Sequence, residues 1–318
     1  RRHAILAVAR ELGYGPREAG PPRVPVGQPL VGCILCRTQE KYNDPFFAPV
    51  LNGLDRGLRS QGLVLSYLYT VHDLDLPSVQ EVLQARYDAV VLVDFVPPRF
   101  VQCLLRTHRF LCQVGMVEPC ARADWVTFDG RGAARRAVEH LLGAGRRRVA
   151  FIGADRGGAG DEGETLFRED RFRGYREALE LAGLGWEPRW VARGDWTVEG
   201  GYRGMRELLE RMRGRRLRPD ALFVASDRMA VGALRALAEA GVKVPDDLAV
   251  VGFDDLEIAA YTQPPLTTVA VPREELGGWA GRIVGLRLRG ELSSPVKVEL
   301  PTRLVVRDTC GARGGRSG

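Results

Sequence analysis

The sequence predicts an α/β protein built from two doubly wound lobes, each with a parallel sheet covered by helices. Three observations support this fold class. The chain has 318 residues, which is more than one hydrophobic core usually organises. Short runs of continuously apolar residues alternate with segments of helical periodicity, as is typical of parallel strands buried on both faces. This alternating series occurs twice along the chain.

The chain starts with a helical pattern that is followed by a linker. Apolar residues at helical spacing over residues 3–12 predict a short helix that ends at Gly13. Residues 15–29 include five prolines, a density that excludes regular structure. We therefore expect a domain boundary before residue 30.

The first alternating series begins at this boundary. Its strands are predicted at 30–35, 64–69, 89–93 and 110–114. Its helices are predicted at 46–61, 78–85 and 99–106.

The second series starts with a strand at 125–128. Its other strands are predicted at 148–152, 189–192, 221–225 and 248–252. Its helices are predicted at 131–142, 171–182, 197–212 and 227–240. Ligands of such sheets bind outside the carboxyl ends of the strands, so two facing units predict a cleft between them. The polar, glycine-rich segment 154–170 follows one of these strand ends and is expected to form its rim.

The composition limits the classes of protein to which the chain can belong. The net charge of +6 permits nucleic-acid binding, but runs such as 146–148 are typical of a solvated surface. No stretch of about 18 apolar residues is present, so we expect no membrane span, and the first residues do not resemble a signal peptide.

Neither metal nor cofactor chemistry is indicated. Cys33 and Cys36 have CxxC spacing, but they lie in an apolar run whose strand geometry points them to opposite faces. Buried free thiols in a reducing cytoplasm are the expected state. The segment 130–135 is the nearest match to a dinucleotide loop, but its third glycine is missing, and no nucleophile or phosphate-loop motif occurs. We expect no cofactor, no metal and no catalytic residues.

Several motifs occur in an order that is specific to one family. The first motif, ARELGYGP over 9–16, covers the end of the predicted helix and the turn after it. The later motifs are DPFFAPVLNG over 44–53, EHLLGAGRRRVAFIG over 139–153, RFRGY over 171–175, GDW over 194–196, PDALFVASDRMAVG over 219–232, VVGFDD over 250–255 and PPLTTV over 264–269. From His3 to Val306 the chain resembles the LacI/GalR family of bacterial transcriptional regulators.

The resemblance implies a periplasmic-binding-protein-like core of two lobes joined by three crossovers. It divides the chain into a remnant of a helix-turn-helix headpiece (1–16), a hinge or linker (17–29), an N-terminal lobe (30–127 plus 270–295), a C-terminal lobe (128–269 plus 296–308) and a disordered tail (309–318). It also implies dimerisation through the cores, a small effector in the cleft and operator DNA as partner.

The resemblance places the candidate effector-binding residues. Sugar recognition needs an aromatic face for the C–H side of the ring and charged planar groups for the hydroxyls. Trp196 is the aromatic candidate, with a core tryptophan as the alternative. Asp254 and Arg171 are the charged candidates. The alternatives are a helix cap or lobe bridge for Asp254 and a surface pair with Asp170 for Arg171.

Further candidates follow from the same comparison. Ser226 stands where the family often has a ligand-binding Asn or Ser, and the following Asp227 is either a helix cap or a contact. The remaining candidates are Phe47, Phe46, Phe128 and Asp44, and for the three phenylalanines a core position is the alternative. Replacing Arg171 by alanine is expected to weaken effector binding and to leave the fold intact.

The sequence departs from the family at two places. Gly115 stands where the family often has an aspartate at the end of the fourth strand, which predicts an unusual effector. In the hinge, Pro21 and Pro22 would break the family's helix, and Arg23 replaces the leucine that wedges into the minor groove.

These observations predict a cytoplasmic DNA-binding repressor whose core binds a sugar and changes operator affinity. One alternative is a periplasmic-type sugar-binding protein, but a helix over 3–12 is not expected in that class. The other is a sensor that has lost DNA binding, which the altered hinge favours. An enzyme is not expected.

Overall fold

The computed structural model describes residues 29–35, 43–70, 87–94, 98–116, 120–154, 165–215 and 217–311. The helix expected at 3–12, the linker expected before Pro29, the helix expected at 78–85, most of the rim expected at 154–170 and the last seven residues lie outside these ranges.

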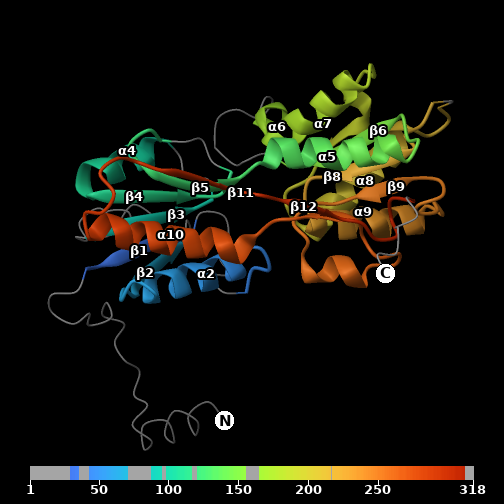
Figure 1. Ribbon diagram of the computed structural model, residues 1–318. Coiled ribbons are helices and arrows are strands. Elements are labelled where there is room, and N and C mark those ends of the chain that lie inside the picture. Colours follow the sequence, from blue (N-terminus) through green and yellow to red (C-terminus); the bar gives the residue numbers. More distant parts are fainter. Residues whose placement is uncertain are drawn as a thin grey trace, which may run out of the picture.

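The first lobe contains a six-stranded parallel sheet in the order β11-β5-β4-β3-β1-β2. Helices cover both faces, with α2 and α10 on one side and α4 on the other (Figure 1). The elements of this lobe are β1 (Val31–Leu35), α2 (Phe47–Arg59), β2 (Leu65–Thr70), β3 (Ala89–Val93), α4 (Pro98–Thr107), β4 (Phe110–Val114), β5 (Asp124–Phe128), α10 (Arg273–Leu288) and β11 (Lys297–Leu300).

Burial on both faces explains the continuous apolar runs of the central strands. Every residue of β1 and β3 is buried. In β1, Cys33 and Leu35 pack in the core beneath α2, whereas Ile34 packs with Leu104 of α4. Cys36 lies outside the described residues.

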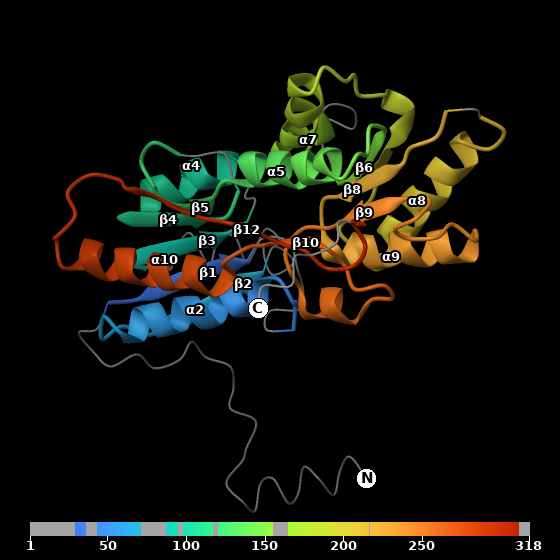
Figure 2. The same ribbon diagram turned by 45° about the vertical axis from the view of Figure 1, so that its right-hand side comes forward.

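The second lobe contains a four-stranded parallel sheet in the order β7-β6-β8-β9. Helices α5 and α7 cover one face, and α8 and α9 cover the other (Figure 2). Its elements are α5 (Gly130–Gly143), β6 (Val149–Gly153), α6 (Thr165–Arg168), α7 (Asp170–Leu181), η2 (Pro188–Trp190), β7 (Val191–Arg193), α8 (Val198–Arg211), β8 (Ala221–Val224), α9 (Asp227–Glu239), β9 (Ala249–Val251) and η3 (Glu257–Tyr261).

Three described connections join the lobes. The chain enters the second lobe after β5, returns to the first between β10 (Thr268–Ala270) and α10, and leaves it again between β11 and β12 (Arg303–Val305). The strands β10 and β12 pair antiparallel as a two-stranded ribbon. The expected boundary placed 296–308 in the C-terminal lobe, but β11 pairs with β5 in the first sheet. The strand expected to open the second series corresponds to β5, which also belongs to the first sheet, between β4 and β11.

The chain remains ordered beyond the expected start of the tail. Thr309 and Cys310 were expected to be disordered, but both are fully buried. The amide of Val250 donates to the carbonyl of Thr309 at 2.7 Å, and the Thr309 hydroxyl donates to the carbonyl of Val250 at 2.7 Å. These bonds extend the pairing at β9, so this prediction was wrong for 309–311. Residues 312–318 lie outside the described ranges.

The helices α2 and α10 pack so closely that glycine is required at the contact. A Cβ atom on Gly277 would overlap the backbone of Val50 and Leu54 on α2. A Cβ atom on the neighbouring Gly278 would lie 3.8 Å from the carbonyl oxygen of Gly53, an ordinary contact distance. The backbones can approach only where one helix has no side chain.

This contrast predicts opposite effects for two neighbouring substitutions. Gly277→Ala is expected to lower the free energy of unfolding by about 1–3 kcal/mol, because overpacking forces the helices apart. Gly278→Ala is expected to raise it by up to about 1 kcal/mol, because alanine favours the helix over glycine. Urea unfolding of both variants measures the difference. Equal effects would show that the helix contact tolerates a methyl group.

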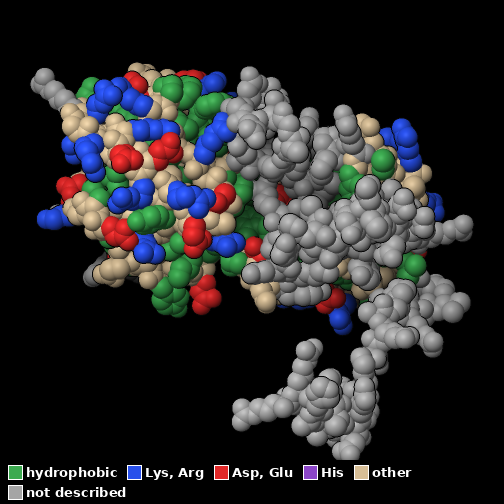
Figure 3. All heavy atoms as spheres, turned by 180° about the vertical axis from the view of Figure 1, so that it is seen from behind, with side chains coloured by type: hydrophobic (Ala, Val, Ile, Leu, Met, Phe, Trp, Pro, Cys, Tyr) green, Lys and Arg blue, Asp and Glu red, His purple; other side chains and the backbone are tan. Residues whose placement is uncertain are grey.

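The surface of the second lobe carries charges of both signs. On the face seen in Figure 3, Lys and Arg side chains are interspersed with Asp and Glu. The described surface of this lobe also holds exposed ion pairs, such as Arg176 with Glu180 and Arg235 with Glu239. The net positive charge is therefore not gathered into one patch on this face. Among the described residues, no helix has both the length and the apolar character that crossing a bilayer requires.

Candidate functional site

A cavity of about 210 Å³ lies between the two lobes. Its wall is formed by the ends of β3, β4 and β5, the start of α2 and a residue of α10, together with the first turns or N-caps of α7, α8 and α9 and the segment after β9. All the predicted site residues lie on this wall: Asp44, Phe46, Phe47, Phe128, Arg171, Trp196, Ser226 and Asp254. That they bind an effector stays a prediction.

Arg171 is held in place by contacts within the second lobe. Its Nε donates to Glu169 Oε1 at 2.8 Å, and its Nη1 donates to the carbonyl of Ala225 at 2.8 Å. Glu169 also accepts the first amides of α7, which compensates the unfavourable position of a cation at a helix start. The guanidinium lies over the Trp196 ring at 4.4 Å. The partner of Arg171 is thus the buried Glu169, whereas Asp170 pairs with Arg173.

Asp254 is a buried carboxylate at the floor of the cavity. Its amide donates to the carbonyl of Val269, which places it where β10 leaves the second lobe. Its Oδ1 lies 3.9 Å from Arg171 Nη1 and has no hydrogen-bond partner among the described residues. Burial raises the pKa of Asp254 well above its ordinary value, and Arg171 opposes this shift. An unsatisfied buried oxygen at a cavity wall is suited to accept a hydrogen bond from a ligand hydroxyl.

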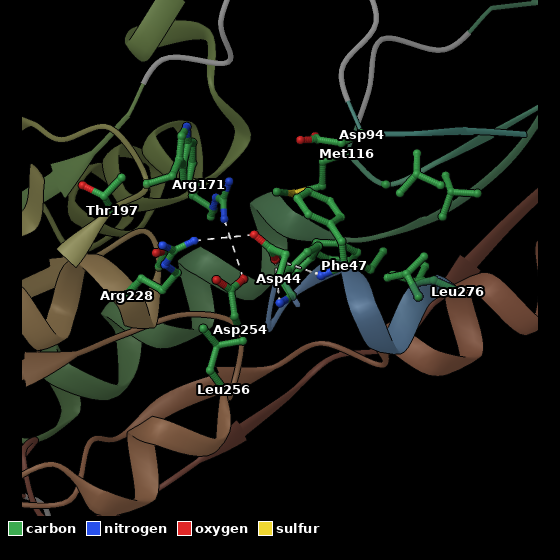
Figure 4. A pocket seen from close by; sticks show the side chains of 18 of the residues that line it. Asp44, Phe47, Asp94, Met116, Arg171, Thr197, Arg228, Asp254, Leu256 and Leu276 are labelled. Carbon is green, nitrogen blue, oxygen red and sulfur yellow. Dashed lines mark hydrogen bonds and ion pairs between the residues drawn. The ribbon is translucent and has the colours of Figure 1, made fainter. Parts of the chain in front are cut away.

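Asp44 and Arg228 face each other across the cleft (Figure 4). Asp44 Oδ1 accepts the amides of Phe46 and Phe47 at 2.9 and 3.1 Å, which fixes it at the start of α2. Its Oδ2 lies 3.5 Å from Nη1 of Arg228, the second residue of α9. Sequence reasoning missed Arg228. Its signal was available, because an arginine in the first turn of a helix opposes the helix dipole, as at Arg171.

Trp196 and Ser226 come from the second lobe. Trp196 has a φ of 67°, a left-handed conformation that a bulky residue rarely adopts without a functional or packing reason. The Ser226 hydroxyl accepts the amide of Met229 at 3.4 Å and so caps α9. Asp227 is neither the cap nor a wall residue. It accepts hydrogen bonds from Thr268 and Leu256, and burial raises its pKa to about 7.

At Gly115 the cavity wall has a glycine where the family often has an aspartate. Gly115 has a φ of 109°, which favours glycine, and its carbonyl accepts the indole N–H of Trp125 at 2.9 Å. The neighbouring strand end contributes Asp94, also on the cavity wall. Sequence reasoning missed Asp94, although it directly follows the apolar run of β3. The cavity therefore has a carboxylate near Gly115, supplied by β3 rather than β4.

The other wall residues that the sequence did not predict are mostly apolar. They provide the hydrophobic surface that a small-molecule site usually has. They are Val50, Val93, Val114, Met116, Asp195, Thr197, Leu256 and Leu276. Val50, Val93 and Val114 hold positions typical of ordinary core residues, so no local signal separates them from the core. Within the described residues, no group of three His, Cys, Asp or Glu side chains is placed to hold a metal ion.

Comparisons with known proteins agree on one family. Residues 138–310 match the periplasmic binding protein-like domain. The chain is 31% identical over 313 residues to the HTH-type transcriptional regulator CelR of Thermobifida fusca, covering 97% of this chain and 89% of that protein. It is 30% identical over 287 residues to the ribose operon repressor of Escherichia coli, covering 86% of this chain and 79% of that protein. The solved structure of a CelR–cellobiose complex superposes with a TM-score of 0.76 at 29% identity, covering 97% of this chain and 90% of that one.

Proposed function

Because the chain belongs to the LacI family of transcriptional regulators, we propose that it is a DNA-binding repressor whose core binds a sugar between its lobes. The observation that carries this proposal is the interlobe cavity with Asp254, Asp44, Arg228 and Ser226 on its wall. These groups suit the hydroxyls of a sugar, and the aromatic and aliphatic wall suits its C–H faces. The relatives are named as regulators and not as enzymes, and one neighbour holds cellobiose.

The same cavity connects effector binding to the relative position of the lobes. Arg228 and Asp44 belong to different lobes. Arg273, the first residue of α10, donates to the carbonyl of Pro45 at 2.8 Å and to that of Asp255 at 2.9 Å, and so bridges the lobes a second time. A sugar that contacts both walls favours one interlobe arrangement. In a homodimer this shift changes operator affinity, with a coupling of about 1–3 kcal/mol.

Thermal unfolding with a panel of sugars tests the proposal. A sugar at 100 times its dissociation constant adds about 2.7 kcal/mol. The unfolding midpoint is then expected to rise by roughly 5–10 °C for a lobe-sized unit. The panel contains ribose, glucose and cellobiose, together with phosphorylated and oxidised derivatives. A panel without any shift would contradict a sugar effector.

Operator binding separates the regulator from its alternatives. Release of the protein from operator DNA by the sugar would identify an inducer, and tighter binding would identify a corepressor. A protein that binds the sugar and no operator would instead be a sensor without DNA function or a periplasmic-type binding protein. We propose the cytoplasm as the place of action, since operator DNA is found there.

Replacing Trp196 by alanine is expected to weaken binding of the panel sugar at least tenfold, or about 1.4 kcal/mol. The loss follows from the aromatic surface that the cavity wall would no longer offer to the C–H faces of the sugar. Isothermal titration measures the affinity. Trp279→Ala on α10 is the matched control, because Trp279 is part-exposed and lies outside the cavity wall. Equal affinities of the two variants would remove Trp196 from the site.

A further inference from the structure

The charged groups of the cavity wall are unequal in number. The described wall carries the carboxylates of Asp44, Asp94, Asp195 and Asp254 but only the guanidinium groups of Arg171 and Arg228. Both guanidinium groups are already paired with a carboxylate, Arg171 with Glu169 and Arg228 with Asp44. Asp195 pairs with Arg203, which lies outside the wall. Among the described wall residues, an anionic ligand would therefore find no guanidinium group that lacks a carboxylate partner.

The four helices that begin at the cavity do not offer their N-termini to an anion. A helix start attracts phosphate through its first amides and its dipole. Here side chains of the protein accept those amides: Asp44 at α2, Glu169 at α7, Thr197 at α8 and Ser226 at α9. Two of these caps are carboxylates, so the favourable position for an anion is occupied at α2 and α7.

Asp44 is the group that neutralises Arg228. Its Oδ1 is held by two backbone amides, and its side chain is only 9% exposed, so Oδ2 is fixed toward the cleft. The Arg228 side chain is 40% exposed and would otherwise face the cavity as a free cation. An exposed guanidinium is a preferred partner of phosphate and carboxylate groups. The pairing with Asp44 suppresses this property.

We propose that Asp44 sets the charge specificity of the cavity: it neutralises Arg228, so that uncharged sugars are accepted and sugar phosphates and sugar acids are rejected. This inference rests on the proposed function, because it specifies the class of effector for the same cavity. Sugar hydroxyl groups can exchange hydrogen bonds with Asp44, Arg228 and Asp254, whereas a phosphate or carboxylate group needs a guanidinium group that Asp44 already neutralises.

Binding of neutral sugars and of their charged derivatives to the unmodified protein tests the inference. Ribose is compared with ribose 5-phosphate, glucose with glucose 6-phosphate, and cellobiose with cellobionic acid, by isothermal titration at low salt. The neutral member of the binding pair is expected to bind at least 100-fold more tightly than its charged partner. A charged member that binds as tightly as its neutral partner overturns the inference and leaves a sugar effector standing. If no compound of either class binds, the proposed function fails, and this inference fails with it.

Asp44→Asn tests the role of Asp44 itself. Asparagine keeps the oxygen that accepts the two amides, so the start of α2 is preserved, but Arg228 loses its negative partner. The preference for the neutral sugar is expected to fall at least tenfold, and Asp44→Asn combined with Arg228→Gln is expected to restore it. The control is Asp55→Asn, which removes a carboxylate that pairs with Arg59 on the exposed face of the same helix. An unchanged preference in Asp44→Asn would show that Asp44 does not determine it.

Discussion

Replacing Arg171 by alanine is expected to lower the free energy of unfolding by about 3–5 kcal/mol and to abolish the sugar-induced rise in the unfolding midpoint. The stability loss arises because Glu169 is fully buried and would lose the guanidinium that neutralises it. Asp254, also buried, would lose the same cation at 3.9 Å. Urea unfolding and sugar titration of the variant measure the two effects separately.

This expectation corrects the one drawn from the sequence, which was that the fold stays intact. A surface arginine could be removed at little cost, but the Arg171 side chain is 9% exposed and its carboxylate partner 1%. The conservative variant Arg171→Lys keeps the charge and loses the planar fork, so it is expected to recover part of the stability but not the sugar affinity.

The matched control is Arg176→Ala on the same helix. The Arg176–Glu180 pair is about half exposed on both sides, so its removal is expected to change stability by less than about 0.5 kcal/mol. Unchanged sugar affinity in a folded Arg171→Ala protein would remove Arg171 from the effector site.

Arg287→Ala is expected to cost a similar amount, about 3–5 kcal/mol, without a direct effect on the cavity. Two nitrogens of Arg287 donate to the two oxygens of Asp124 at 2.9 and 2.7 Å, with side chains that are 6% and 4% exposed. The same arginine donates to the carbonyl of Leu292, and Asp124 also accepts the amide of Val296. The pair thus joins α10, β5 and the segment that leads to β11, and alanine would leave Asp124 as an unpaired buried charge.

Two further variants sharpen this test. Arg289→Ala removes an exposed arginine just after the same helix, which pairs with Glu291, and is expected to be nearly neutral. Replacing both buried partners, as Arg287→Met with Asp124→Leu, is expected to recover most of the loss, because no charge remains buried. If Arg287→Ala and Arg289→Ala show equal unfolding midpoints in urea, the buried pair does not stabilise the lobe.

The sequence by itself determined the alternating α/β organisation and the family. The central strands are buried on both faces, so each is a continuous apolar run that can be recognised from a few neighbouring residues, as in 89–93. The resemblance also located the predicted side chains of the cavity wall, because they stand at strand ends and helix starts that the motifs mark. Trp196 and Asp254 are examples.

The sequence did not determine the sheet to which β11 belongs, the ribbon of β10 and β12, or the partners of the charged groups. The strands β10 and β12 have three residues each, too few for a periodic signal, and β11 is exposed on alternate residues at the edge of its sheet. The pairs Asp44–Arg228 and Asp124–Arg287 join residues more than 160 positions apart. Periodicity and capping are local properties that a sequence displays, whereas the pairing of two distant charges depends on how the lobes pack, which only the tertiary structure decides.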